Sequence, residues 1–394
     1  MIRNSVSLPE RSAALQATKE TTNAELGADA QHGGMVVLSR PERRSKASAS
    51  VRSGSPSSDF RTGADQESSG IRRRPMPPGL PRTSCTALAA LLTAVLATVP
   101  AGPAFAFTGG NHEDVTRAAL PWEPIALTEM ADAQAGAINA NDHPPYFDVG
   151  PLHCDNADYL ASRYASDYPR TRDEATTELL ACIRTSVTRF RNAVEAADGL
   201  VDADGKVRAD QSDLSSHCTW DGKPGRAKCA VLEQLGRGWH QIEDFYSHSN
   251  WSDRPAPGPV GLDNPPGLER TDVAPFLDIR RYSAMKDADW TRDARERIPA
   301  DLATGCYTDI DSTGVKPDCD GRVTHNRALN KDTAASARSK TGDDFRHATA
   351  GATAEITRQW NDFKAELLAK YPDHRRGAQM VCALVHDEPA GACP

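Results

Sequence analysis

Three side chains of metal-ligand type are spaced four residues apart in the segment HQIEDFYSH: His240, Asp244 and His248. Positions i, i+4 and i+8 stack along one face of an α-helix, which has about 3.6 residues per turn. Two imidazoles and a carboxylate on one ridge are donors that a divalent cation of the zinc type accepts. The alternative is a solvated polar face with two ordinary histidines. The regular spacing and the scarcity of histidine, 11 in 394 residues, favour a metal site.

Apolar residues at intervals of three and four predict that this ridge lies on a helix over residues 227–250. The core-facing stripe of that helix is Leu232, Leu235, Trp239, Ile242 and Tyr246. The ridge lies beside the stripe, so we expect it at the edge of the core. Further helices are predicted at 113–120, 124–139, 171–197 and 343–371. Because strand-type alternation is not sustained anywhere, the sequence predicts a single all-α domain over residues 107–394.

The first 106 residues are expected to lie outside that domain. Residues 1–75 are rich in serine, arginine, glycine and alanine, which predicts a disordered stretch or an extension from a misplaced start codon. Residues 76–106 contain an apolar run at 87–96 and an A-x-A site ending at Ala106, and arginines precede the run, as is typical of a secretory signal peptide. The alternative is a transmembrane anchor, but a span needs about 20 consecutive apolar residues. We therefore expect cleavage after Ala106, secretion, and no transmembrane segment in the mature chain.

The charge of the mature chain argues against nucleic acid as its stable partner. The full sequence has 46 basic and 54 acidic side chains, of which residues 1–106 hold 13 and 8. The rest has 33 basic and 46 acidic side chains and a net charge of −13. A nucleic-acid-binding surface is usually basic. A phosphodiester substrate is still compatible with this charge, because bound cations reverse the local field.

The cysteines predict a disulfide-stabilised, exported domain. Nine cysteines occur, and one of them, Cys85, belongs to the predicted signal peptide. The remaining eight are typical of disulfides in an exported chain. Since eight cysteines allow on the order of a hundred connectivities, the sequence does not fix the pairing, and we expect pairs close in sequence. These are Cys154–Cys182, Cys218–Cys229, Cys306–Cys319 and Cys382–Cys393. A cysteine zinc site is the alternative, and the sequence has no C-x-x-C motif to support it.

The segment HQIEDFYSHSNW, residues 240–251, resembles the central motif of the Het-C family of heterokaryon-incompatibility proteins. That family is similar in turn to the zinc-dependent phospholipases C and, more distantly, to the S1/P1 nucleases. These enzymes are all-helical and hold three zinc ions. The resemblance touches most of residues 107–363, although only this segment is specific. It implies a single helical domain of phospholipase C type with two or three zinc ions as cofactor.

The resemblance also implies ligands near the start of the mature chain. Phe107 would be the N-terminal residue and would bind one zinc through its amino group and carbonyl, with His112 shortly after it. Asp142 and His153 lie in the segment NDHPPYFDVGPLH, which resembles the part of the phospholipases that supplies two ligands to another zinc.

The remaining ligands follow from the central motif. His240 and Asp244 would complete the zinc of Asp142 and His153, with Asp244 bridging two metals, and His248 would begin the third site. The phospholipase pattern completes that site with His-x3-Glu, which does not follow here. The next two histidines, His325 and His347, lie in segments that resemble the C-terminal part of the Het-C pattern, so we assign them instead. Surface histidines on polar helices are the alternative.

These assignments predict a secreted, zinc-dependent phosphodiester hydrolase of phospholipase C type, acting on a phosphodiester or phospholipid. The catalytic carboxylates would be Asp142 and Asp244, which hold the ions, and Asp148 is a candidate general base. Bound zinc would make hydroxide available near neutral pH and stabilise charge on the substrate oxygens. If this is right, the ligand atoms of Asp142, His153, His240 and Asp244 should lie within about 4–5 Å of a common point.

Two other functions fit the same residues. One is a non-catalytic, secreted helical module whose zinc is structural and which binds partners or membrane surfaces, since shared ligands do not guarantee shared chemistry. The other is a nuclease, which would need basic and aromatic side chains along its cleft. The acidic balance of the mature chain disfavours the nuclease.

Overall fold

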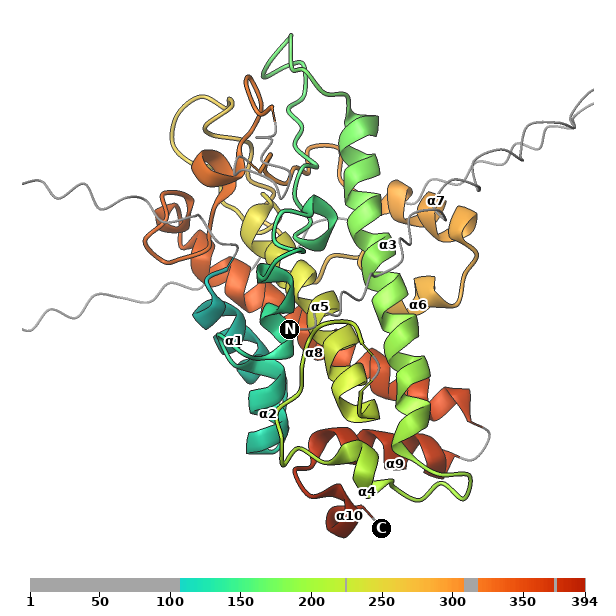
Figure 1. The fold of residues 1–394 in the computed structure, drawn as a ribbon. Coiled ribbons are helices and arrows are strands. Elements are labelled where there is room, and N and C mark those ends of the chain that lie inside the picture. The colour runs from blue at the N-terminus through green and yellow to red at the C-terminus, as the bar shows by residue number, and fades with distance from the viewer. Residues whose placement is uncertain (1–106, 224, 308–317, 372–373, 394) are drawn as a thin grey trace, which may run out of the picture. The chain divides into compact units, whose positions relative to one another are not determined.

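The computed structural model describes part of the chain, all of it in one compact unit (Figure 1). The described residues are 107–393 apart from 224, 308–317 and 372–373. The predicted disordered stretch at 1–75 and the predicted signal peptide at 76–106 lie outside the described residues, so both stay predictions.

The described residues are helical, as predicted. Three long helices, α3 (Arg172–Ala196), α5 (Ala227–His248) and α8 (Asp344–Lys370), match the three longest predicted segments. The shorter helices are α1 (Gly109–Ala119), α2 (Pro124–Ala131), α4 (Ala209–Ser212), α6 (Ile279–Ser283), α7 (Asp287–Arg297), α9 (His374–Val385) and α10 (Pro389–Ala392). Short 3-10 helices are η1 (Ala137–Asp142), η2 (Gly150–Leu152), η3 (Ala197–Leu200) and η5 (Arg338–Lys340), and η4 (His325–Leu329) is a short π-helix. In the described ranges, β-type pairing is confined to isolated bridges.

One predicted helix is shorter than expected. The segment 124–139 was predicted to be continuous, but α2 ends at Ala131. The carboxylate of Asp132 accepts hydrogen bonds from the backbone N–H groups of Gln134 and Ala135, at 2.9 and 2.8 Å, and so stabilises a turn. Aspartate competes with helix formation by such local bonds. The break lets the chain re-enter the core as η1, which ends at Asp142.

Helix α5 lies at the centre of the core. Nearly all of its residues are buried, and it packs against α3, α8 and η1. Gly236 is required for the contact with η1, because a Cβ there would lie 2.5 Å from the carbonyl carbon of Ala137. The backbones of η1 and α5 can therefore approach closely just one helical turn before His240. This contact brings Asp142, at the end of η1, towards the histidine.

Four disulfides join the cysteine pairs that are close in sequence, which confirms the predicted connectivity. The bonds are Cys154–Cys182, Cys218–Cys229, Cys306–Cys319 and Cys382–Cys393. Such a set is typical of extracellular proteins. Among the helices of the described ranges, none is long and apolar enough to cross a membrane.

Candidate metal centre

The three donors predicted on one helical ridge lie together on α5, and none of their side chains is exposed. His240 Nε2 lies 3.1 Å from Asp244 Oδ2, and His248 Nε2 lies 3.9 Å from Asp244 Oδ1. The shared face is therefore confirmed. The expected position at the edge of the core is wrong, because other segments cover the ridge completely. The alternative of a solvated polar face is excluded by the same burial.

Asp142 and His153 converge on this ridge from the N-terminal half of the domain. Asp142 Oδ1 lies 3.4 Å from His240 Nε2, and His153 Nδ1 lies 3.1 Å from the same nitrogen and 2.8 Å from Asp244 Oδ2. Four donors at 2.0–2.1 Å from a zinc ion would be about 3.3 Å apart. Because Asp142, His153 and Asp244 all lie within 3.4 Å of His240 Nε2, the predicted convergence is confirmed.

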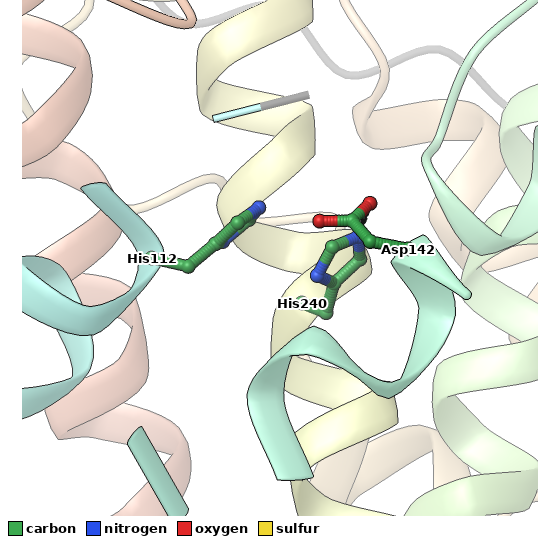
Figure 2. Close-up of side chains that lie close together, drawn as sticks. All are labelled: His112, Asp142 and His240. Atoms are coloured by element: carbon green, nitrogen blue, oxygen red, sulfur yellow. Dashed lines mark ion pairs between the residues drawn. The ribbon is translucent and has the colours of Figure 1, made fainter. Parts of the chain in front are cut away.

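His112, on α1, approaches Asp244 from the other side. Its Nε2 lies 3.2 Å from Asp244 Oδ1, and its ring stacks on that of His240 with 4.2 Å between ring centroids. Figure 2 shows His112, Asp142 and His240 turned towards one another from three separate segments. The two oxygens of Asp244 thus face different histidines, as a bridging carboxylate requires.

A further cluster of donors forms around His248. Its Nε2 lies 3.2 Å from Asp332 Oδ1, and His325 Nε2 lies 3.4 Å from Asp332 Oδ2. All three side chains are buried. The assignment of His325 to the neighbourhood of His248 is therefore supported by geometry.

Within the described residues, three groups of donors thus have the spacing to hold a metal ion. We name them after one carboxylate each. The Asp142 group is His112, Asp142 and His240; the Asp244 group is His153, His240 and Asp244; the Asp332 group is His248, His325 and Asp332. The ligand atoms of each group lie within 4.8 Å of one another.

Two residues that the sequence assigns to the site, His347 and Phe107, lie outside the three donor groups of the described residues. His347 belongs to none of the three groups in the described part of the chain. It lies in the first turn of α8, partly exposed, with Nε2 3.3 Å from a guanidinium nitrogen of Arg346. Phe107 is buried, and its ring contacts the edge of His112 at 5.7 Å between centroids. That position beside His112 is compatible with a role at the site, and ligation by its amino group stays a prediction.

Asp332 is the donor that the sequence analysis missed. It lies seven residues after His325 in an irregular segment, so no helical spacing relates the two. The only signal was its place in the segment that resembles the C-terminal part of the Het-C pattern. Ser247 Oγ donates a hydrogen bond to Asp332 Oδ1 at 2.8 Å, and Asn330 donates to Oδ2. Adjacent Lys331 is fully buried, 3.0 Å from Asp253 Oδ1, which anchors the backbone of this segment.

Several of the buried donor atoms make no hydrogen bond, although carboxylate oxygens and imidazole nitrogens lie close to one another. Among the described residues, His112 Nε2, Asp142 Oδ1, Asp244 Oδ1, His248 Nε2 and His325 Nε2 are buried atoms without a hydrogen bond. A buried polar atom left without a partner costs about 1–3 kcal/mol. A divalent cation bound to these atoms would remove that cost. The donor set of imidazole nitrogens and carboxylate oxygens therefore fits a metal of the zinc type.

The pKa shifts of the buried side chains also favour positive charge in the cluster. Burial alone would lower the pKa of His240, but the charges of Asp244 and Asp142 raise this pKa well above its ordinary value. Burial would raise the pKa of the Asp244 carboxyl, but His240 and His248 hold it well below its usual range. The carboxylates therefore stay ionised and favour positive charge in the cluster. Protons on the imidazoles or a divalent cation can supply that charge, so the two must compete.

A buried arginine holds the segment that carries Asp142. The guanidinium of Arg237 donates hydrogen bonds to Ala140 O at 2.8 Å and to Asn141 Oδ1 at 3.1 Å. The amide of Asn141 in turn donates to Leu152 O at 3.2 Å and to Arg237 O at 3.0 Å. These bonds join the backbone next to Asp142, the backbone next to His153, and α5 one turn before His240. They position three donors from distant parts of the sequence.

Comparison of the chain with protein-family models, with curated proteins and with solved structures gave no match.

Proposed function

We propose that this protein is a secreted, zinc-dependent phosphodiester hydrolase of phospholipase C type. The observation that carries the proposal is the set of three adjoining donor groups, in which Asp244 faces histidines on both sides and His240 is shared by two groups. Cations held by these residues would make hydroxide available near neutral pH and would stabilise the negative oxygens of a phosphodiester.

Zinc is favoured over harder cations by the donor set. Five imidazoles occur in the three groups, whereas calcium and magnesium prefer all-oxygen surroundings. The eight cysteines of the mature chain are all in disulfides, so none is left as a thiolate ligand. The same four disulfides support secretion.

Substrate would approach from the side of Asp142 and His153. Their side chains are 10% and 6% exposed, whereas those of the other donors are at most 4% exposed. The segment that follows Asp142 in the chain, from His143 to Val149, is mostly on the surface. It contains Asp148, which we retain as the candidate general base. In this arrangement Asp142 would help to hold a cation near the entrance, and Asp244 would help to hold cations deeper in the site.

Membership of the Het-C family is part of the proposal. Its support is the HQIEDFYSHSNW segment together with the positions of His112, Asp142 and His153, which the resemblance assigned to the site and which do meet α5. A nuclease is disfavoured by the acidic charge of the mature chain.

The depth of the site favours one alternative, a non-catalytic secreted module with structural zinc. The Asp332 group is buried, with at most 4% of any of its side chains exposed, which suits an ion that stabilises the fold. Structural zinc sites have four protein ligands, whereas catalytic sites keep one position open for water or substrate. The number of protein ligands on each bound ion therefore distinguishes the enzyme from the structural module.

The test is metal analysis of the exported protein, followed by an assay on a chromogenic phosphodiester with and without a chelator. We expect at least two equivalents of zinc and an activity that is lost with the zinc and restored by its return. His217→Gln is a matched control, because the side chain of His217 is 91% exposed and belongs to no donor group. Stoichiometric zinc without hydrolysis of phosphodiesters or phospholipids would favour the structural alternative. Absence of bound divalent metal would refute both.

A further inference from the structure

A buried carboxylate outside the three donor groups contacts one of their histidines. Glu243 precedes Asp244 on α5 and has no exposed surface. Its Oε2 lies 2.5 Å from His112 Nδ1, and its Oε1 accepts a hydrogen bond from Thr116 Oγ1 at 2.8 Å. Both oxygens of Glu243 thus contact side chains of α1.

The contact between Glu243 and His112 favours one of the two neutral tautomers of the histidine. When Glu243 is ionised its oxygens can only accept, so the hydrogen bond with His112 then requires a proton on Nδ1. In the neutral ring, Nε2 then carries the lone pair, and this nitrogen lies 3.2 Å from Asp244 Oδ1. A metal-ligating histidine needs this arrangement, in which an outer carboxylate fixes the tautomer and the ring orientation.

We propose that Glu243 is a positioning residue that holds His112 in the Nδ1–H tautomer, with Nε2 prepared to bind a cation beside Asp244. The tautomer itself follows from the contacts of Glu243. Its consequence for metal binding rests on the proposed function, in which His112 is a ligand. The competing explanation is that Glu243 only docks α1 onto α5.

Glutamine at position 243 separates these explanations because it keeps the size and reverses the hydrogen bond. Its carbonyl can still accept from Thr116, so the contact between α1 and α5 is retained. Its amide then faces His112 Nδ1 as a donor. That arrangement favours the Nε2–H tautomer, in which the proton occupies the lone pair needed for the metal.

Thr116→Val is the matched control. Thr116 is buried on α1, one turn from His112, and its hydroxyl occupies the other oxygen of Glu243. Valine has a similar shape, so this variant removes one hydrogen bond of the docking contact without touching the bond to His112. If Glu243 only docks the helices, the two variants should behave alike.

Two measurements on the exported protein test the proposal. Long-range proton–nitrogen correlation spectra of the metal-free protein report the tautomer of His112 once its ring is neutral. Because the neighbouring carboxylates raise the pKa of His112, the spectra are recorded as a pH series up to about pH 11 rather than just above the ordinary imidazole pKa of about 6.5. We expect Nδ1–H in the wild type and in Thr116→Val, and Nε2–H in Glu243→Gln. Zinc affinity by competition with a chromophoric chelator should fall by about 10–100-fold in Glu243→Gln and by less than about threefold in Thr116→Val.

Each outcome decides a different point. An Nε2–H tautomer in the wild type overturns the proposal even if Glu243→Gln does not fold. Equal losses of zinc affinity in the two variants also overturn it, in favour of a docking role. If the wild-type protein binds no zinc, the proposed function fails, while the spectra still decide whether Glu243 sets the tautomer.

Discussion

Asp244→Asn is the substitution that tests the centre most directly. Asp244 has His153 and His240 within 3.1 Å of one oxygen, and His112 and His248 within 3.9 Å of the other. Asparagine keeps the shape, but it removes the negative charge and presents a weak carbonyl donor on one side only. We therefore expect the loss of a ligand from two metal positions at once.

The magnitude follows from the number of donors. A structural zinc ion with four ligands binds with about 10–16 kcal/mol, so one ligand in four accounts for about 3 kcal/mol. Since about 1.4 kcal/mol corresponds to a tenfold change, zinc affinity should fall by about two orders of magnitude at each affected position. Free zinc at a concentration 100 times its dissociation constant stabilises a fold by about 2.7 kcal/mol. The variant, with its weaker zinc affinity, should therefore lose most of the zinc-dependent rise in Tm.

The assay is calorimetric unfolding with increasing zinc, together with metal analysis after dialysis. Asp343→Asn is the matched control, because Asp343 has a side chain 74% exposed and a backbone φ of 65°, which asparagine adopts readily. We expect the control to keep the zinc content and the Tm shift of the wild type. If Asp244→Asn also keeps them, Asp244 is not a bridging ligand and the assignment of the site is wrong.

Three further predictions concern other parts of the molecule. The carboxylates raise the pKa values of the buried imidazoles, so protons compete with zinc for these nitrogens. As the pH drops from 8 to 6, zinc affinity should fall by up to about tenfold per pH unit for each proton that zinc displaces. A zinc affinity that does not change with pH would contradict this. Burial and the neighbouring Asp253 raise the pKa of Asp344 to about 6. The folded protein therefore favours the protonated carboxyl, and the stability that this gives is present below about pH 4 and is lost as the pH rises through 6. Asp344→Asn, which keeps the acceptor for the Arg254 N–H, should therefore stabilise the fold by about 1–2 kcal/mol at pH 8 and by little at pH 4 in denaturant unfolding. Finally, Asp332→Asn should remove about one equivalent of zinc whereas His347→Gln should remove none, and the reverse result in metal analysis would restore His347 as the ligand.

The sequence by itself determined the features that depend on local geometry. The ridge of His240, Asp244 and His248 could be predicted because 3.6 residues per turn fixes which positions share a helical face. The long helices followed from apolar periodicity, and the four disulfides from pairs 11 to 28 residues apart. His112, Asp142 and His153 came from a resemblance, since no local rule relates them to α5.

Only the tertiary structure decided how deep the site lies and which donors complete it. Asp332 lies in an irregular segment 84 residues after His248, where no periodicity constrains the path of the chain. His347 lies on the regular helix α8, where its Nε2 lies beside a guanidinium nitrogen of Arg346, and it belongs to none of the donor groups in the described residues. Glu243 shares α5 with the ligands, but its role depends on α1 packing against it. A helical spacing fixes the direction of a side chain relative to its own helix, whereas the partners that it meets depend on long-range packing.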